Sequence, residues 1–458
     1  MSQSTISYRQ HTRAMLLLGI PLIGSHLANA AVGLTDTIML GWYDVEALAA
    51  GVLATGLFFM LFVMASGFSF AVMPMVASAS SAGDTAQVRR VTRMGLWLSV
   101  AIGMLLFPLL WWSGPILRLL GQEPVIADLA QTYLRIAGVG MFPALLVMVL
   151  KSYMAAQERA NIVLWVTIVG ALGNALANWV LIFGKWGFPE MGIAGAALAS
   201  LINHSLMLLG LGLYALRVFP EHALLQRLWR PDPEALRSVF RLGWPIGLTH
   251  LAESGMFAAS AIMVGWVGTL PLAAHGIALQ LASTTFMVHI GLSQAATVRA
   301  GRAYGTSDIS GLLRGGQVSF MLAMTMVVFT MAAFLGMPKT LISLFLDPAD
   351  PDRLAIITIG VGLLAMAALF QLADGTQAMA LALLRGVQDT RVPMIQAAVS
   401  YWLVGLPTGY LLGFWTPLGA IGIWLGLVAG LSCAALLLLH RFWWQRFWMQ
   451  DMVAPAAP

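Results

Sequence analysis

Charged side chains are scarce in this chain. Only 9% of its 458 residues are Asp, Glu, Lys or Arg, whereas 59% are hydrophobic. A soluble globular domain carries about 25% charged residues. A surface so poor in charge cannot be solvated by water, so we exclude a soluble protein and expect lipid as the solvent. The shortage of polar sequence also excludes a separate soluble domain.

Cysteine and the common catalytic motifs are also lacking. Cys433 is the only cysteine, which excludes a disulfide framework within the chain and a multi-cysteine metal site. The sequence has no phosphate-binding Gly-Lys-Ser/Thr loop, no His-Glu-x-x-His motif and no serine-hydrolase elbow. We therefore expect a protein that is not an enzyme, has no cofactor and does not use ATP by itself.

Long apolar segments are abundant. About 20 apolar residues in a helix span the roughly 30 Å of membrane hydrocarbon. The strands of a membrane barrel would instead alternate in character over about ten residues. We expect an all-α integral membrane protein with about 12 transmembrane helices. The predicted spans are 14–40, 49–79, 95–117, 130–150, 162–183, 192–216, 240–267, 274–298, 316–337, 355–384, 395–414 and 419–440.

The basic residues are distributed unevenly between these spans. With a cytoplasmic N-terminus and twelve alternating spans, 19 of the 24 Lys and Arg residues fall in inner segments and 4 in outer loops. This positive-inside pattern predicts that both termini are cytoplasmic. Because the basic residues follow the topology, the net charge of +5 does not indicate a nucleic-acid partner. We expect membrane lipid to surround the protein.

The two halves of the chain resemble each other. A shift of 224 residues places 13–50 over 237–274 with 14 identities in 38 positions. Spans one and seven both begin inside, so the repeats of six helices are parallel and would enclose a cavity between two lobes. The predicted domains are an N-lobe (1–218), a cytoplasmic linker (219–238), a C-lobe (239–442) and a cytoplasmic tail (443–458).

Three acidic residues lie inside predicted spans: Asp36 in span one, Glu253 in span seven and Asp374 in span ten. A charge at mid-membrane costs about 3 kcal/mol on insertion scales, so such residues are functional candidates. No Lys or Arg falls at a similar depth in the predicted spans. We expect carboxyl groups that exchange a proton or a cation. The alternative is a carboxyl that only bonds a neighbouring helix for packing.

Span five carries two asparagines, Asn174 and Asn178, four residues apart and therefore on one helical face. With Asp36 they would supply three side-chain oxygens to a hard cation such as Na⁺. Hydrogen bonding between helices is the alternative.

Two further pairs correspond in the repeat. His250 precedes Glu253 by three residues and matches His26, so the histidines are candidates for a proton relay or for structural hydrogen bonds. Pro21 matches Pro245. These prolines either mark the first turns of their helices or kink the spans and act as hinges.

Several motifs together resemble the multidrug and toxic compound extrusion (MATE) family, and within it the NorM-type branch. The resemblance runs over nearly the whole chain. It rests on 33–39 (Gly-Leu-Thr-Asp-Thr-Ile-Met), 174–179 (Asn-Ala-Leu-Ala-Asn-Trp), 184–190 (Gly-Lys-Trp-Gly-Phe-Pro-Glu), 240–245 (Phe-Arg-Leu-Gly-Trp-Pro), 273–275 (Ala-Ala-His), 384–386 (Leu-Arg-Gly) and 400–410 (Ser-Tyr-Trp-Leu-Val-Gly-Leu-Pro-Thr-Gly-Tyr).

The resemblance implies two six-helix lobes around a V-shaped cavity, in a functional monomer of the bacterial cytoplasmic (inner) membrane. It implies antiport of H⁺ or Na⁺ against lipophilic organic cations such as fluoroquinolones and cationic dyes. By motif, Asp36, Asn174 and Asn178 match the family's N-lobe cation site, and Glu253 and Asp374 match the acidic C-lobe site of the NorM-type branch. Either set is a possible Na⁺ site.

Some relatives carry a carboxylate where this chain has Asn178, so the resemblance implies a less anionic N-lobe pocket here. We favour H⁺ as the coupling ion, because the visible side-chain oxygens fall short of a full Na⁺ shell.

Four alternatives remain open. A lipid-linked precursor flippase of the same superfamily would line its cavity with arginines, whereas the basic residues here lie almost wholly at the inner ends of spans. A major-facilitator transporter also has six plus six spans, but its basic-glycine signature is missing from the loop at 82–90. A polytopic membrane enzyme would need reactive groups clustered near one membrane face. A passive channel would not transport against a gradient.

Overall fold

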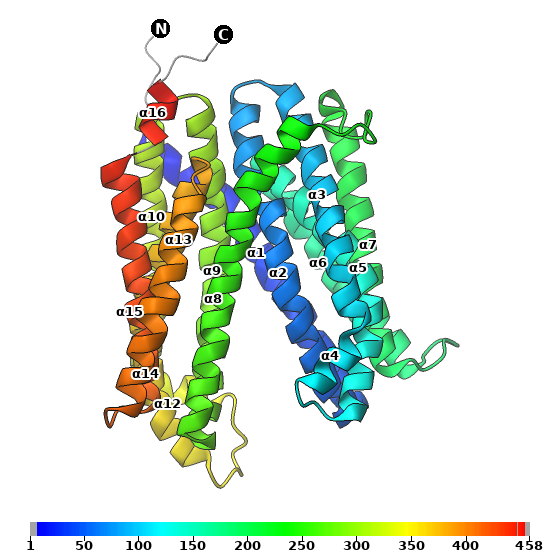
Figure 1. Cartoon of the computed structure of the whole chain (residues 1–458), viewed down its shortest axis with the longest axis vertical. Helices are drawn as coiled ribbons and strands as arrows, with labels where there is room; N and C mark the ends of the chain where they lie inside the picture. The colour runs from blue at the N-terminus through cyan, green and yellow to red at the C-terminus, as the bar shows by residue number, and fades with distance from the viewer. Residues whose placement is uncertain (1–6, 447, 454–458) are drawn as a thin grey trace. The chain divides into compact units, whose positions relative to one another are not determined.

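The computed structural model describes residues 7–446 and 448–453, and all regular structure in these ranges is helical. The helices (Figure 1) are α1 (Tyr8–Tyr43), α2 (Val45–Ser81), α3 (Thr85–Trp111), α4 (Ser113–Leu119), α5 (Pro124–Ala156), α6 (Ala160–Phe183), α7 (Gly192–Val218), α8 (Pro233–Val267), α9 (Thr269–Gly305), α10 (Ile309–Gly336), α11 (Pro338–Ser343), α12 (Arg353–Gly386), α13 (Arg391–Val399), α14 (Leu406–Phe414), α15 (Ala420–His440) and α16 (Trp448–Val453). Three short segments complete them: η1 (Pro220–His222), η2 (Ser400–Gly405) and η3 (Arg441–Gln445).

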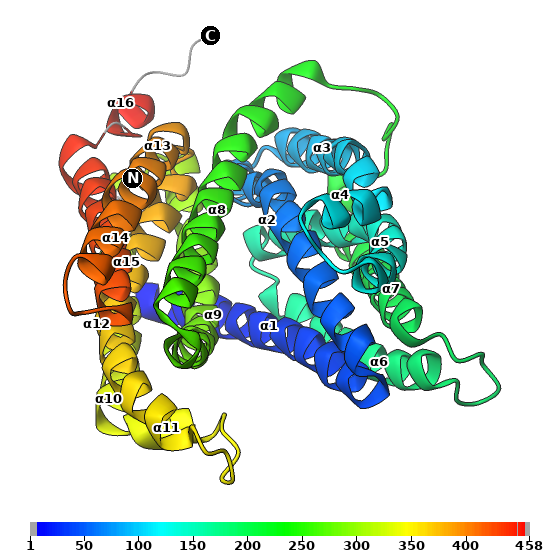
Figure 2. The same cartoon turned by 60° about the horizontal axis from the view of Figure 1, so that its bottom comes forward.

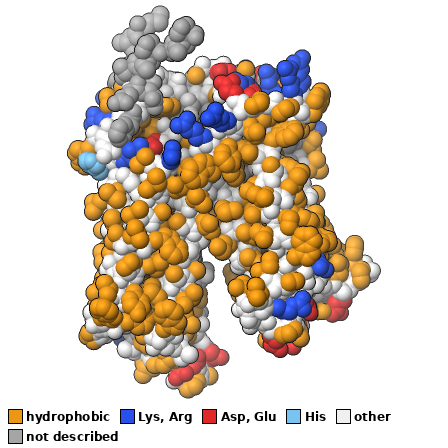
Figure 3. Space-filling view, in the orientation of Figure 1, with side chains coloured by type: hydrophobic (Ala, Val, Ile, Leu, Met, Phe, Trp, Pro, Cys, Tyr) orange, Lys and Arg blue, Asp and Glu red, His pale blue; other side chains and the backbone are white. Residues whose placement is uncertain are grey.

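The helices confirm the predicted fold class. Eleven segments of the described residues are long and apolar enough to cross a membrane, with α13, η2 and α14 forming one continuous span. The twelfth predicted span is α8, whose 35 residues are ample in length but whose mean hydropathy is lowered by His250 and Glu253. On the visible face of each half, hydrophobic side chains cover the middle and charged ones gather at the ends (Figure 3).

The order of elements repeats. In each half, three long helices are followed by one short helix and then by three more spans, so that α4 corresponds to α11 (Figure 2).

The N-terminal caps of the third helix in each half repeat as well. Asp84 accepts a hydrogen bond from the backbone N–H of Gln87 at the start of α3. Asp308, 224 residues later, accepts one from Gly311 at the start of α10. Each satisfies a donor that the first helical turn leaves open.

The chain forms two compact units, one of residues 24–247 and one of residues 1–23 with 248–458. Their boundaries fall inside α1 and α8 at positions 224 residues apart, equivalent in the repeat. The lobe boundaries predicted from the sequence stay a prediction. Residues 1–6 of the predicted N-lobe, and 447 and 454–458 of the predicted tail, lie outside the described residues.

Glycines allow the first part of α8 to pack closely against α2, and the first part of α1 to pack closely against α9. A Cβ atom at Gly67 of α2 would lie 2.3 Å from the backbone nitrogen of Gly247 of α8. A Cβ atom at Gly291 of α9, the repeat equivalent of Gly67, would lie 2.6 Å from the backbone nitrogen of Ile23 of α1. Small residues allow such close approach of membrane helices.

Pro21 and Pro245 lie in helix interiors. The helices begin at Tyr8 and Pro233, so the alternative that these prolines mark first turns is wrong. A proline in a helix interior leaves the carbonyl four residues earlier without its helical partner. Both prolines stand two residues before the boundaries between the compact units. Their role as hinges stays a prediction.

Each unit is built around one enclosed helix. In residues 24–247, α5 packs against α2, α3 and α7, and in the other unit α12 packs against α9, α10 and α15. No residue of α5 from Gly140 to Ala156 is exposed, and none of α12 from Ala373 to Gly386.

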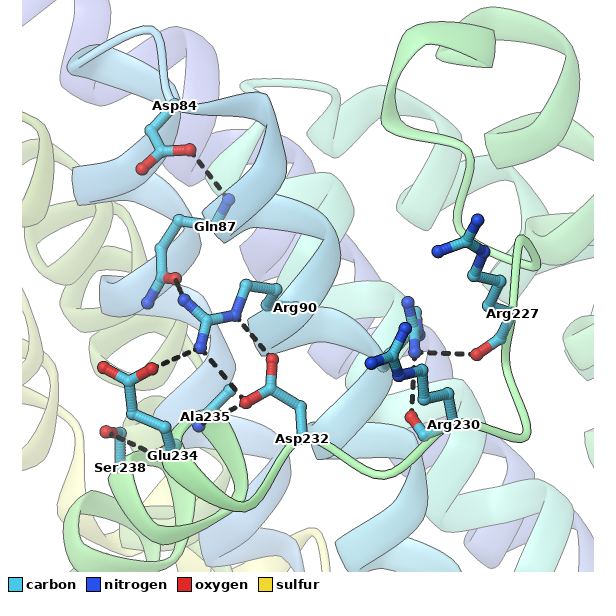
Figure 4. A network of polar contacts seen from close by, with 10 residues as sticks. Asp84, Gln87, Arg90, Arg227, Arg230, Asp232, Glu234, Ala235 and Ser238 are labelled. Carbon is cyan, nitrogen blue, oxygen red and sulfur yellow. Dashed lines mark hydrogen bonds and ion pairs between the residues drawn. The ribbon is translucent and has the colours of Figure 1, made fainter.

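The linker before α8 is held on α3 by arginines (Figure 4). The Nε atom of Arg90 lies 2.5 Å from Asp232, and its Nη2 atom lies 2.6 Å from Glu234. The Nη2 atom of Arg93 donates to the carbonyl oxygens of Arg227 and Arg230 at 2.7 and 3.0 Å. The Arg90 guanidinium also holds the pKa of the Asp232 carboxyl below its ordinary value of 3.8.

Candidate functional site

Asp36, Asn174 and Asn178 lie together in the unit of residues 24–247. The Nδ2 atom of Asn174 donates to Oδ1 of Asp36 at 2.7 Å, and Nδ2 of Asn178 donates to the same oxygen. The exposed fraction of Asp36 is 8%. The i, i+4 spacing aims both amides from α6 at α1, and a buried hydrogen bond of 3.1 Å between Ser25 and Thr167 joins the same two helices.

Two more polar residues belong to this cluster. The Oγ atom of Ser200, on α7, donates to Oδ2 of Asp36 at 3.3 Å. Tyr133, buried on α5, lies within electrostatic range of Asp36. The sequence reasoning missed both, because a serine or a tyrosine in a span has no signal that separates it from many others. Ser200 and Tyr133 come close to Asp36 only because α7 and α5 pack beside α1 and α6.

Open oxygen atoms remain in the cluster. The Oδ1 atoms of Asn174 and Asn178 are buried and have no hydrogen-bond partner among the described residues. With Asp36 and Ser200 they make a group of four neighbouring side chains that bear oxygen. Such a group can accept a proton at the carboxyl group or coordinate a hard cation.

Glu253 and Asp374 lie together in the other unit. Glu253 is half-buried on α8, and Asp374 on α12 has an exposed fraction of 2%. The two carboxyl groups lie within electrostatic range of each other. No group of three or more His, Cys, Asp or Glu side chains among the described residues is arranged to hold a metal. The pair can therefore share a proton or a single charge, but alone it does not form a protein-ligated metal centre.

Arg385 corrects one expectation. It is half-buried on α12 and lies within electrostatic range of Glu253. A base therefore lies nearer to Glu253 than the predicted spans indicated, although the two form no ion pair among the described residues. The sequence placed Arg385 in an inner connection because the apolar run ends at 384, but α12 continues to Gly386 and carries the arginine inside the unit.

Tyr401 and Trp402 border the same acids from segment η2. Tyr401 is fully buried, lies within electrostatic range of Glu253 and Asp374, and accepts a hydrogen bond from Nε2 of Gln377. The Nε1 atom of Trp402 donates to the backbone oxygen of Ala252 at 3.1 Å, one residue before Glu253.

Segment η2 is a π-helix of residues Ser400–Gly405, followed closely by Pro407. The N–H of Leu406 bonds the carbonyl of Tyr401, five residues back. Because Pro407 has no N–H, the regular α-helical pattern cannot continue unbroken through this segment. Single π turns occur often at functional sites. The proline in span eleven was the sequence signal that could have indicated this irregularity.

The two predicted relay histidines fall in different units. His26 lies on α1 within residues 24–247, whereas His250 lies on α8 within 248–458. Arg385 lies within electrostatic range of His250, so His250 belongs to the neighbourhood of Glu253. A proton relay through either histidine stays a prediction.

The MatE family model matches residues 21–180 and 245–411. The chain belongs to the MATE family. A probable multidrug resistance protein NorM of Rhizobium meliloti (strain 1021) is 44% identical over 462 residues, covering 100% of this chain and 98% of the relative. The protein of the same name from Agrobacterium fabrum (strain C58 / ATCC 33970) is 43% identical and covers 95% of this chain and 94% of the relative.

Solved MATE structures share the fold. A MATE in complex with MaL6 matches with a TM-score of 0.86 at 22% identity, over 96% of this chain and 97% of that one. The eukaryotic MATE transporter AtDTX14 matches with a TM-score of 0.84 at 18% identity, over 97% and 98%. As a MATE protein, the chain is a multi-pass membrane transporter and not an enzyme.

Proposed function

We propose that this MATE chain is a cation-coupled multidrug antiporter that exports lipophilic organic cations from the cytoplasm by alternating access. Its relatives are called probable multidrug resistance proteins. One observation carries the proposal: carboxyl groups lie among polar side chains on membrane helices in both compact units. They are Asp36 in one unit and Glu253 with Asp374 in the other.

The mechanism is exchange at these carboxyls. An ionised carboxylate attracts an organic cation strongly in a medium of low dielectric constant. A proton or Na⁺ that binds the same carboxyl neutralises it and weakens that attraction, so ion and drug oppose each other's binding. Asn174 and Asn178 keep one oxygen of Asp36 oriented.

H⁺ is the favoured coupling ion, because the oxygens of the Asp36 cluster fall short of a full Na⁺ shell. The pair of Glu253 and Asp374 is the alternative Na⁺ site. The proposed setting is the bacterial cytoplasmic membrane, with both termini cytoplasmic and the monomer as the working form. Fluoroquinolones and cationic dyes are the proposed substrates.

The test is ethidium efflux from proteoliposomes under an imposed pH gradient and, separately, an imposed Na⁺ gradient. Wild type is compared with Asp36→Asn, Glu253→Gln and Asp374→Asn. Asp128→Asn is the matched control, because this exposed carboxylate pairs with Arg118 at the surface.

We expect uphill efflux under one gradient that the three variants lose and the control keeps. If all three variants kept uphill efflux, the protein would still be an exporter, but exchange at the carboxyl groups would be refuted. No uphill movement under either gradient would refute the antiporter. A lipid-linked precursor flippase would then be tested next.

A further inference from the structure

Four arginines, Arg89, Arg93, Arg227 and Arg230, gather where the linker crosses the start of α3; we call them the arginine cluster. Arg93 has an exposed fraction of 8%. The other three lie within electrostatic range of it. The two hydrogen bonds from Arg93 to backbone carbonyls of the linker fix this arrangement. Because like charges repel, the cluster is costly unless an anion joins it.

The carboxylates beside the cluster are already engaged by Arg90 (Figure 4). Its Nε and Nη2 atoms bond the two oxygens of Asp232 at 2.5 and 3.1 Å, and the Nη2 atom also lies 2.6 Å from Glu234. Asp232 is within electrostatic range of Arg93 as well, so two cations share its single charge. The protein's own acids therefore leave most of the positive charge of the cluster without compensation.

Three of the four guanidinium groups contact no partner in the part of the chain that the structure describes. The side chains of Arg89, Arg227 and Arg230 form no hydrogen bond and no ion pair there. The Nε atom of Arg93 is buried and also has no hydrogen-bond partner among those residues. A guanidinium group presents paired N–H donors that match the oxygens of a phosphate. The cluster is therefore suited to a phosphate group.

An apolar row on α3 continues from the arginines. Residues four apart lie on one helical face, and the row that begins with Arg89 and Arg93 continues with Trp97, Ala101 and Leu105. Trp97 is 41% exposed and Leu105 is 70% exposed, and Ala101 is exposed as well. Positive charge at the end of a membrane helix, followed by exposed apolar side chains, matches the headgroup and the acyl chain of one lipid.

The linker adds a second tryptophan beside this row. Trp229 stands between two arginines of the cluster in the sequence and is 76% exposed. The preceding residue, Leu228, accepts a hydrogen bond of 2.8 Å at its backbone oxygen from Nε1 of Trp97. Tryptophan is enriched where the membrane meets water. A soluble phosphate compound would leave these apolar surfaces uncovered, whereas a phospholipid would cover them.

The second repeat shows that membrane topology alone does not require this arrangement. The residues 224 positions after Arg89 and Arg93 are Leu313 and Gln317 of α10. Both repeats begin on the same predicted side of the membrane and need basic residues there. The second repeat meets this need without arginine at these two positions. The pair on α3 therefore has a further role.

We propose that the arginine cluster binds the phosphate headgroup of an anionic phospholipid, whose acyl chain lies along Trp97 and Leu105. The phosphate offsets the repulsion among the arginines and so stabilises the linker on α3. The inference goes beyond the proposed antiport and does not depend on it, because it involves neither the deep carboxyl groups nor a transported molecule.

The test measures lipid binding to the purified full-length protein in detergent micelles by native mass spectrometry. The probes are phosphatidylglycerol, which is anionic, and phosphatidylcholine with the same acyl chains, which has no net charge. One triple variant combines Arg89→Gln, Arg227→Gln and Arg230→Gln, and keeps Arg93 because it holds the linker. The matched control removes the same charge at three exposed arginines of other segments, by Arg13→Gln, Arg159→Gln and Arg391→Gln.

We expect wild type and the control to bind phosphatidylglycerol more tightly than phosphatidylcholine. The triple variant should raise the Kd for phosphatidylglycerol at least about tenfold, since each arginine near a lipid headgroup contributes about fivefold. Its Kd for phosphatidylcholine should stay at the wild-type level. Equal affinity of wild type for the two lipids, or an equal loss in the triple variant and the control, would overturn the inference.

Inorganic phosphate in excess, at an ionic strength matched with chloride, distinguishes a lipid from a free phosphate. Phosphatidylglycerol should stay bound; its displacement by phosphate but not by chloride would assign the site to a soluble ligand and overturn the inference. If the triple variant does not fold, the three single variants decide. Each should raise the Kd for phosphatidylglycerol about fivefold, and three unchanged values would refute the site.

Discussion

Asn174 donates a hydrogen bond of 2.7 Å to the carboxylate of Asp36 across 138 residues of sequence, tying α6 to α1 inside one compact unit. Asn178 bonds the same oxygen. Residue 178 is therefore the position at which a second carboxylate would meet Asp36 directly.

Asn178→Asp is predicted to make transport more dependent on Na⁺. Two carboxylates in contact repel each other, so a cation between them is bound more tightly. Ethidium efflux by the variant should respond to Na⁺ at a concentration at least about tenfold lower than any at which wild type responds. Asn161→Asp, at the exposed start of the same helix, serves as control and should leave the Na⁺ response at the wild-type level. An unchanged response in Asn178→Asp would contradict the assignment of Asp36 to the ion site.

Trp402→Phe is predicted to slow efflux through its effect on Glu253. The substitution removes the hydrogen bond from Nε1 to the carbonyl of Ala252. A hydrogen bond of this type contributes about 1 kcal/mol, so the initial rate of ethidium efflux should fall roughly three- to tenfold. Trp415→Phe is the control, because Trp415 is exposed. Equal rates in the two variants would show that η2 does not position the acidic site.

The clamp between Arg90 and Asp232 is predicted to stabilise the linker. A double-mutant cycle with Arg90→Ala and Asp232→Ala should give a coupling energy of about 1 kcal/mol, since both side chains are partly exposed and water screens the pair. High salt should reduce it. Because the pKa of Asp232 is lowered in the folded protein, the contribution is present above its ordinary value of 3.8. It is lost as the pH falls through the lowered value. A coupling that persists in acid would point to packing and not to charge.

His222 is predicted to make stability depend on pH just below neutrality. Burial lowers the pKa of His222 below its ordinary value of 6.5, opposed by Glu221, and its Nδ1 atom bonds the hydroxyl of Tyr153. The unfolded chain therefore binds a proton that the folded one resists. Stability is full above pH 6.5 and declines as the pH falls below it, by at most about 1.4 kcal/mol per pH unit.

The measurement is the melting temperature of the purified protein between pH 8 and pH 5, in wild type and in His222→Gln. The variant keeps an amide that can bond Tyr153 but loses the titrating group. Its melting temperature should fall less over this range than that of wild type. Parallel curves would show that His222 contributes nothing to the pH dependence.

The sequence predicted the helices well because their signal is local. Apolar length and the distribution of basic residues indicated twelve spans, and the repeat indicated their arrangement in two sets. The pairing of Asp36 with Asn174 and Asn178 was also accessible, because a carboxylate and two amides at i, i+4 spacing in spans stand out against an apolar background.

Other features depend on how helices are rotated against each other, which no local pattern encodes. Ser200 reaches Asp36 only because α7 presents it there. The extent of helices beyond the apolar run was a second source of error. α1 and α8 begin several residues before the predicted spans, which moved Pro21 and Pro245 into helix interiors. α12 extends past 384 and brings Arg385 within electrostatic range of Glu253.

The position of the unit boundaries bears on how the two repeats depend on each other. Each compact unit takes the first part of one helix from the opposite repeat, the start of α1 up to Ile23 in one case and the start of α8 up to Gly247 in the other. A lone repeat of this chain would lack that piece. Two copies of it would complete each other only by exchanging helix ends, the arrangement of a domain-swapped homodimer. The present chain contains this exchange within one polypeptide, with the acid of the first repeat at position 36 and those of the second at 253 and 374.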